Sequence, residues 1–236
     1  MPDAGFQPWT ITAVNLPEHS DNPVHTAEGG RAAGYDGAVV AGTTIYAYLT
    51  RPVAARWGAE WVTSGACETA FKAPVLEDDP VQIGTDESGR LVASVDGREC
   101  AWLTPTLAST PLAEPRGDRL EPLDMKLSDF WTGYAARAGE DLALYEENQL
   151  VHPVVWPSLA NRVFRMQLVT GAWVHTRSRI RHLGTARPDD TVNIESFLID
   201  RFSSRAGERA LVDIRMSVGG RPVAAVEHEA IVALER

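Results

Sequence analysis

The stretch Asp78-Asp79-Pro80-Val81-Gln82-Ile83 recurs in altered form 111 residues later as Asp189-Asp190-Thr191-Val192-Asn193-Ile194. Offsets that drift by a few residues are typical of duplicated elements joined by loops of different length. A unit of about 110 residues has the size of a domain and not of a solenoid repeat. The sequence therefore predicts two similar halves that pack together around one working site. Three further matches support the repeat: Trp61-Val62 with Trp173-Val174, Val39-Val40 before Gly42-Thr43 with Val154-Val155 before Pro157-Ser158, and Gly97-Arg98 with Gly220-Arg221.

Composition narrows the class of protein. The chain has 236 residues, a formal net charge of −10 and no run of Lys or Arg, which argues against nucleic acid and anionic membrane as partners. A local arginine cluster can still bind an anionic substrate. The first residues show no signal pattern, and no stretch reaches transmembrane length. The two cysteines, Cys67 and Cys100, are too few for a disulfide scaffold, so we expect buried free thiols and a cytoplasmic protein.

Each half contains one predicted helix followed by strands. The first helix is expected from near Thr43 to near Gly58, with Gly58 as its C-cap and a kink or a restart at Pro52. The second is expected from about Pro157 to Leu168. Apolar and polar residues then alternate with period two over residues 174–181, 211–218 and 226–234, which predicts antiparallel strands with one buried face.

The predicted fold class is α+β. We expect an N-terminal half over residues 1–108, a proline-containing linker over 109–124 and a C-terminal half over 125–236. An antiparallel sheet wrapped around a central helix, duplicated in tandem within one chain, resembles the double hotdog. Such a chain is a pseudo-dimer by itself, and further homodimerisation is left open.

The loop before the first helix carries a more specific resemblance. It reads Asn22-Pro23-Val24-His25, then Gly34-Tyr35, then residues 37–43 as Gly-Ala-Val-Val-Ala-Gly-Thr. This is similar to the MaoC-like, (R)-specific enoyl-CoA hydratase family. There an Asp-x-Asn-Pro-x-His loop precedes a Gly-Phe step, and a turn of small residues ending in Gly opens the hotdog helix.

The chain departs from that family at one important place. The family's catalytic Asp stands five residues before the His, and here that position is Ser20, with Asp21 one residue later and Glu18 two before. The second half lacks the motif and has Glu146, Glu147, Asn148 and His152 before its helix. It therefore looks like a degenerate partner that builds the acyl tunnel.

The resemblance implies a lyase that hydrates an enoyl thioester or dehydrates a 3-hydroxyacyl thioester. His25 is the candidate acid–base group, since its ordinary pKa lies near working pH. Asn22 would fix the water or the imidazole. The N–H of Gly42 or Thr43, at the helix N-terminus, would polarise the thioester carbonyl. The remaining candidates are Ser20 and Asp21 for water activation, Tyr35 and Trp156 for the acyl tunnel, and Arg177, Arg179 and Arg181 for the phosphates of coenzyme A or phosphopantetheine.

No resident cofactor is expected, because the substrate itself is a coenzyme A or phosphopantetheine thioester, and an acyl carrier protein is a candidate partner. No metal site is expected either, because His152, His175, His182 and His228 show no ligand spacing with Cys or carboxylates. His19 is expected to be solvated. The same residues also have purely structural interpretations: a loop position for His25, a turn former for Asn22-Pro23 and a solvated face for the arginines.

Two alternative functions are also consistent with the sequence. A hotdog thioesterase usually places a carboxylate on or near the central helix, but residues 43–56 contain no Asp or Glu. A non-catalytic module that binds acyl thioesters is the third hypothesis, because Ser20 stands where the family has Asp.

Overall fold

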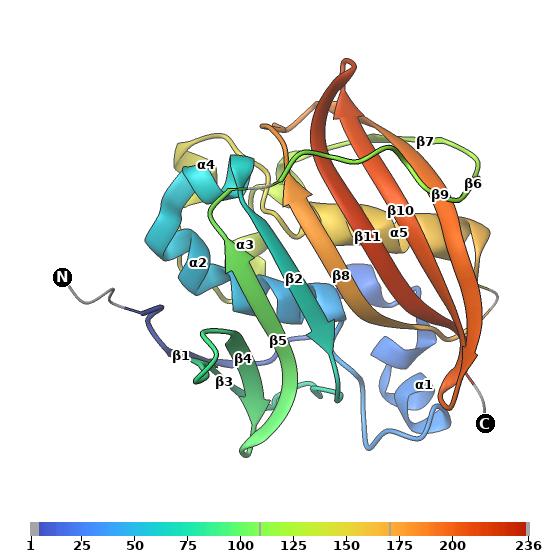
Figure 1. Ribbon diagram of the computed structural model, residues 1–236. Coiled ribbons are helices and arrows are strands. Elements are labelled where there is room, and N and C mark those ends of the chain that lie inside the picture. Colours follow the sequence, from blue (N-terminus) through green and yellow to red (C-terminus); the bar gives the residue numbers. More distant parts are fainter. Residues whose placement is uncertain (1–4, 109, 170, 235–236) are drawn as a thin grey trace.

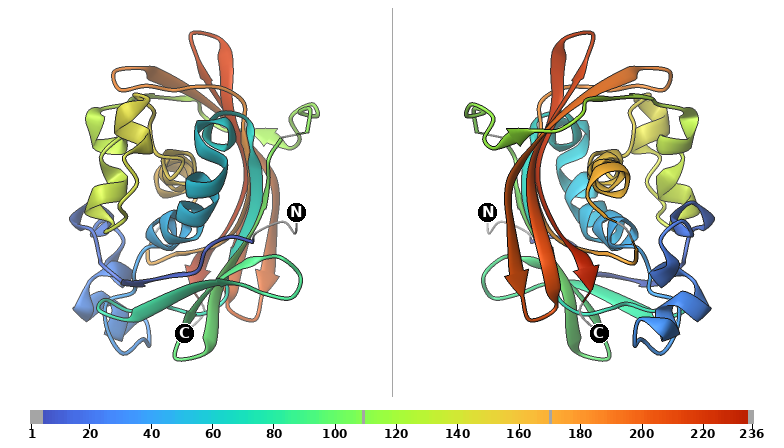
Figure 2. Two further views of the ribbon diagram at one scale, coloured as in Figure 1. Left: turned by 90° about the vertical axis from the view of Figure 1, so that its left-hand side faces the viewer. Right: turned by 90° about the vertical axis from the view of Figure 1, so that its right-hand side faces the viewer.

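A single curved antiparallel sheet holds two central helices in its concave face (Figures 1 and 2). The computed structural model describes residues 5–108, 110–169 and 171–234. Within them the sheet has eleven strands. Ten of them follow one another as β1 (Trp9–Thr12), β3 (Pro80–Thr85), β4 (Leu91–Val95), β5 (Arg98–Thr106), β2 (Ala66–Phe71), β8 (Val174–His182), β11 (Arg221–Leu234), β10 (Gly207–Val218), β9 (Thr191–Ser204) and β6 (Asp118–Arg119), while β7 (Leu123–Lys126) also pairs with β9.

The sheet is built twice from the same strand order. The series β1-β3-β4-β5-β2 in the first half corresponds to β7-β9-β10-β11-β8 in the second. The halves meet at the β2–β8 pair, where Glu68 lies opposite Arg179. One sheet therefore runs through both halves, and the boundary between them is a strand pair.

The aspartate repeat marks the same turn in both halves. Asp78 and Asp189, just before β3 and β9, have φ of 68° and 72°, a left-handed conformation that Asp tolerates better than most residues. The next residues, Asp79 and Asp190, each accept the N–H of the residue three places earlier, at 2.7 and 2.9 Å. These pairs are turn residues, as the sequence predicts.

The matched pairs Gly97-Arg98 and Gly220-Arg221 also occupy equivalent positions in the two halves. Asp96-Gly97 and Gly219-Gly220 join β4 to β5 and β10 to β11 with positive φ at both turn residues, as a two-residue type I′ hairpin requires. Trp61 and Trp173 are not equivalent, because Trp61 lies in helix α2 (Gly42–Ser64) and Trp173 precedes β8.

The two central helices follow their predicted positions with shifted ends. Helix α2 breaks at Gly58, where φ is 62° and ψ −155°, but six further helical residues carry it to Ser64. Pro52 lies inside α2, and the expected kink or restart there is wrong, because the non-helical residue is Gly58. Helix α5 spans Val155–Gln167, so the two helices begin 113 residues apart and not 115.

Short helical segments cover the side of α2 and α5 that faces away from the sheet (Figure 2). These are η1 (Pro17–His19), η2 (Pro23–His25), α1 (Ala27–Ala32), η3 (Asp129–Trp131), α3 (Tyr134–Arg137) and α4 (Leu144–Glu147). The expected linker is partly sheet, because β6 and the start of β7 pair with β9; Ser109 lies outside the described residues. Cys67 and Cys100 are buried free thiols. In the described part of the chain, no helix is long and apolar enough to cross a bilayer.

Candidate active site

A cavity of about 520 Å³ lies between the two halves. The first half supplies the loop around His25 and the start of α2. The second half supplies one face of α5 and the first residues of β8. Most of the remaining wall is apolar and includes Phe71, Trp131 and Trp173. The pocket is thus built by both halves, as the duplicated sequence predicts.

The imidazole of His25 is held in its neutral form. Its Nδ1–H donates to the carbonyl oxygen of Val39 at 2.7 Å, which leaves the lone pair on Nε2. The side-chain amide of Asn15 braces the same place by donating to the carbonyl of His25 at 2.7 Å. Burial lowers the pKa of His25, although its bond to Val39 opposes the shift. The imidazole is therefore unprotonated at neutral pH, with Nε2 able to accept a proton.

Asn22 fixes the His25 loop to the other half of the chain. It is 6% exposed, and its Nδ2 donates to the carbonyl of Trp173 at 2.9 Å. The same nitrogen is 3.5 Å from His25 Nε2, and Oδ1 caps η2 by accepting the N–H of Val24. These contacts place Asn22 beside the imidazole of His25 and tie its loop to the second half.

The expectation of a solvated His19 is wrong. Its ring lines the cavity 6.1 Å from the ring of His25, and its Nε2 lies 3.2 Å from the hydroxyl of Tyr134. Burial lowers the pKa of His19 to about 4, with smaller contributions from His25 and Arg137. Two neutral imidazoles therefore share one pocket.

The carboxylates near the motif are engaged elsewhere. Ser20, at the position of the family's Asp, is exposed and does not line the cavity. Asp21 lines it but forms an ion pair with Arg165, and Glu18 pairs with Arg137 at 3.4 Å. The described residues therefore place imidazoles, and no unpaired carboxylate of this loop, in the cavity.

Helix α2 directs its N-terminus at this cavity. Gly42, its first residue, lines the wall, and Thr43 is fully buried. The N–H groups of Thr44 and Ile45 donate to the carbonyl of Ala41, whereas those of Gly42 and Thr43 have no acceptor among the described residues. Free N–H groups and the helix dipole favour negative charge at this point.

A buried chain of hydrogen bonds from β8 reaches the same place. His175 is 6% exposed, lines the cavity, and its Nδ1 lies 3.4 Å from where a Cβ on Gly42 would stand. Its Nε2 is 2.8 Å from Ser178 Oγ, which is 2.8 Å from Nδ1 of His228. Nδ1 of His175 has no hydrogen-bond partner among the described residues. Burial lowers the pKa of His175 to about 3 and that of His228 well below its ordinary value.

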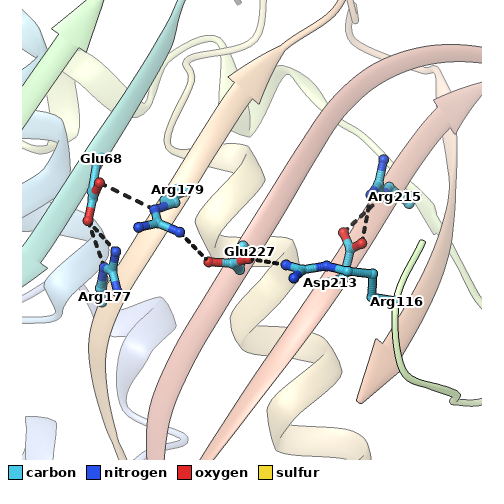
Figure 3. Close-up of polar contacts among 7 residues, drawn as sticks. All are labelled: Glu68, Arg116, Arg177, Arg179, Asp213, Arg215 and Glu227. Carbon is cyan, nitrogen blue, oxygen red and sulfur yellow. Dashed lines mark hydrogen bonds and ion pairs between the residues drawn. The ribbon is translucent and has the colours of Figure 1, made fainter. Parts of the chain in front are cut away.

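Other predicted site residues lie apart from the cavity. Tyr35 lines it, but Trp156 is 2% exposed in the core and does not. Arg177, Arg179 and Arg181 do not line it either. Figure 3 shows Arg177 and Arg179 on the sheet, paired with Glu68, and Arg179 also reaches Glu227. Among the described residues, no three His, Cys, Asp or Glu side chains gather as metal ligands.

Three cavity residues carried signals that sequence reasoning did not use. His19 stands immediately before the motif. Strict alternation over residues 174–181 predicts His175 on the outer face with the arginines, but a register shift at Glu229/Ala230 turns it to the inner face with Ser178. Arg162 lies two turns into the second helix, on the face that meets the cavity.

Comparison with known proteins identifies the fold. The sequence matches no protein-family model, and a search of curated proteins gave no match. Among solved structures, a conserved hypothetical protein of Mycobacterium tuberculosis with a double hotdog fold aligns at a TM-score of 0.70 and 10% identity, covering 97% of this chain and 96% of that one.

Two further solved structures cover nearly all of both chains. A MaoC-like dehydratase aligns at a TM-score of 0.61 and 12% identity over 96% of this chain and 98% of that one. A Lactobacillus plantarum protein described as an oleoyl thioesterase aligns at 0.57 and 11% over 98% and 99%. At these identities the likeness shows the fold, and the predicted α+β double hotdog is confirmed.

Proposed function

We propose that this double hotdog protein is an acyl-thioester enzyme that hydrates an enoyl thioester or dehydrates a 3-hydroxyacyl thioester. One observation carries the proposal. The unprotonated Nε2 of His25 and the free N–H groups that open α2 belong to the same cavity. A base and an anion-stabilising helix end are the two elements that addition of water to a conjugated thioester requires.

In the hydration direction, His25 acts as a single base. Nε2 takes a proton from water while the water oxygen bonds to C3 of the enoyl group, and the C2=C3 electrons move toward the thioester carbonyl. The imidazolium then returns the proton to C2, so one water adds across the double bond. Dehydration is the same path reversed. This scheme uses no carboxylate, which is consistent with the exposed Ser20 and the ion-paired Asp21.

The thioester oxygen gains negative charge during this addition. The amides of Gly42 and Thr43 are the donors we assign to it, and Nδ1 of His175 stands beside Gly42 as a third polar group. In the tautomer with hydrogen on Nδ1, Nε2 accepts from the Ser178 hydroxyl, which accepts from Nδ1–H of His228. A preorganised donor of this kind lowers the activation barrier by about 3 kcal/mol.

The test is turnover of crotonyl-CoA and of (R)-3-hydroxybutyryl-CoA, followed by enoyl-thioester absorbance and, in parallel, by a thiol reagent. We expect reversible loss of absorbance without thiol release. His25→Ala should abolish it and leave the circular dichroism spectrum unchanged, whereas Glu28→Gln, an exposed change on α1, should not affect the rate. Thiol release would identify a thioesterase. An active His25→Ala variant would remove His25 from the mechanism.

A further inference from the structure

One turn of α5 presents three polar side chains to the cavity. Ser158, Asn161 and Arg162 are spaced i, i+3 and i+4, so they share one face of the helix, and all three line the cavity wall. Ser158 Oγ, Asn161 Oδ1 and Arg162 Nε are buried atoms without a hydrogen-bond partner in the described part of the chain. Buried polar atoms in folded proteins are nearly always paired, so an unpaired group of three on one wall points to a missing partner.

Arg162 stands out among the basic residues of the cavity. Lys72 pairs with Glu99 at 2.7 Å, Arg209 with Glu229 at 2.5 Å, and Arg165 with Asp21. For Arg162 no carboxylate lies within ion-pair distance among residues 5–108, 110–169 and 171–234. In a chain with a net charge of −10, this guanidinium has been left without an acidic neighbour.

A neutral acyl chain would not satisfy such a wall. Covering a guanidinium with methylene groups removes its water and supplies no hydrogen bond, which is unfavourable. A carboxylate or phosphate oxygen accepts from the guanidinium in a charge-assisted bond, and a hydroxyl and an amide beside it add further donors. The amide of Asn161 serves as donor after a rotation that exchanges its nitrogen and oxygen.

We propose that Ser158, Asn161 and Arg162 form an anion-binding subsite that takes an oxyanion group of the substrate, either a carboxylate on the acyl chain or a phosphate of the carrier arm. The inference rests on the proposed function, because it assigns the ligand of that same cavity. It places substrate recognition in the half of the chain that lacks the Asn-Pro-x-His loop. That half then selects the substrate, while the first half carries the base.

Binding of saturated thioesters tests the subsite without requiring turnover. The four ligands are butyryl-CoA, succinyl-CoA and the N-acetylcysteamine thioesters of the same two acids, each titrated calorimetrically. They separate a carboxylate on the acyl group from the phosphates of coenzyme A. The proteins are the wild type, Arg162→Gln, Arg162→Lys, Asn161→Asp and the control Arg119→Gln, which changes an exposed arginine of β6.

We expect Arg162→Gln to weaken binding by on the order of tenfold or more, the effect of one charge-assisted hydrogen bond. If the acyl carboxylate is the anion, only the two succinyl thioesters lose affinity. If a phosphate is the anion, only the two coenzyme A thioesters do. Asn161→Asp should weaken the same pair, because it adds a negative charge with almost no change of shape, and Arg162→Lys should retain part of the affinity.

Three results would overturn the subsite. They are affinities of Arg162→Gln within twofold of wild type for all four ligands, an equal loss for butyryl-N-acetylcysteamine, which carries no anion, and no binding of any of the four by the wild type. Failure of the hydratase proposal gives a different pattern: the anion-dependent binding remains while crotonyl-CoA is not turned over.

Discussion

The side chain of Asn22 donates a hydrogen bond to the backbone carbonyl of Trp173, and this contact joins the His25 loop to the residue immediately before β8. The two residues are 151 positions apart in the sequence. His175 comes two residues after Trp173, so this contact holds the His25 loop near the segment that carries the polar group beside Gly42. The geometry of the site therefore depends on how the halves are docked.

Removing this contact should impair catalysis more than substrate binding. Asn22→Ala leaves the Trp173 carbonyl unpaired and releases the imidazole, which should cost about 1–2 kcal/mol of stability and lower kcat with a smaller change in KM. Urea unfolding and steady-state kinetics measure the two effects. Asn148→Ala, a change of an exposed residue at the C-terminal end of α4, is the matched control. Equal kinetics for the two variants would contradict the positioning role.

The pH profile should show an acid limb below pH 6.5. His25 works as a base only when unprotonated, and burial lowers its pKa. Activity should therefore be full at neutral pH and fall as pH drops through that lowered pKa. The profile of kcat/KM against pH gives the midpoint. A midpoint above 6.5 would mean that another group is the base.

Ser20 should be replaceable. Its side chain is exposed and outside the cavity wall, so Ser20→Ala should keep the wild-type rate. Ser20→Asp restores the residue type of the resembled family but puts its carboxylate in solvent, and we expect no gain. Parallel assays of the three proteins decide this. A loss in the first variant, or a large gain in the second, would show that the loop closes differently around substrate.

The buried chain behind Gly42 should matter to the chemical step. His175→Phe keeps a ring of similar size and removes the nitrogen, and we expect a fall in kcat of roughly a hundredfold with little change in KM. Ser178→Ala breaks the link to His228 and should give a smaller fall. Steady-state kinetics with a thermal unfolding control separate these effects from misfolding. A change confined to KM would argue for a role in binding alone.

Stability should decline in mild acid because several histidines are buried in their neutral form. Burial lowers the pKa of His182 to about 4 and that of His175 to about 3, against 6.5 in the unfolded chain. Between pH 6.5 and about 4 the unfolded state thus binds more protons, and stability is complete only above 6.5. Each group contributes a slope of about 1.4 kcal/mol per pH unit.

Urea unfolding from pH 7 to 5 measures this slope. His182→Gln removes one titrating group and should flatten the dependence whatever it does to the absolute stability. A free energy of unfolding that stays constant or rises toward pH 5 would contradict the neutral burial of these side chains.

Local chemistry made much of the fold predictable. The paired aspartates before β3 and β9, the hairpin glycines and the break at Gly58 each depend on a few neighbouring residues. The place of His25 in the motif and of Gly42 at the helix start follow from the same kind of signal.

Contacts between distant segments were not predictable in this way. His19 lies in the pocket against the hydroxyl of Tyr134, which comes from a distant part of the chain. A bulge in β8 turns His175 inward. Two arginines of β8, Arg177 and Arg179, form ion pairs with Glu68 because β8 pairs with β2 across the two halves. A single sequence does not show which carboxylate lies opposite which cation. The absence of an acidic neighbour for Arg162 in the described part of the chain was therefore not predictable either.

Joining both central helices, α2 and α5, in one polypeptide removes a constraint that applies to a symmetric dimer. In a dimer of identical chains, every replacement appears on both central helices at once. Aligned by their first residues, Ser158, Asn161 and Arg162 of α5 occupy the places of Ile45, Tyr48 and Leu49 of α2. The latter three are buried, where a polar replacement without a hydrogen-bond partner would be destabilising. In one fused chain each central helix has its own sequence, so α2 can keep apolar residues at these positions while α5 carries polar residues that recognise a charged group.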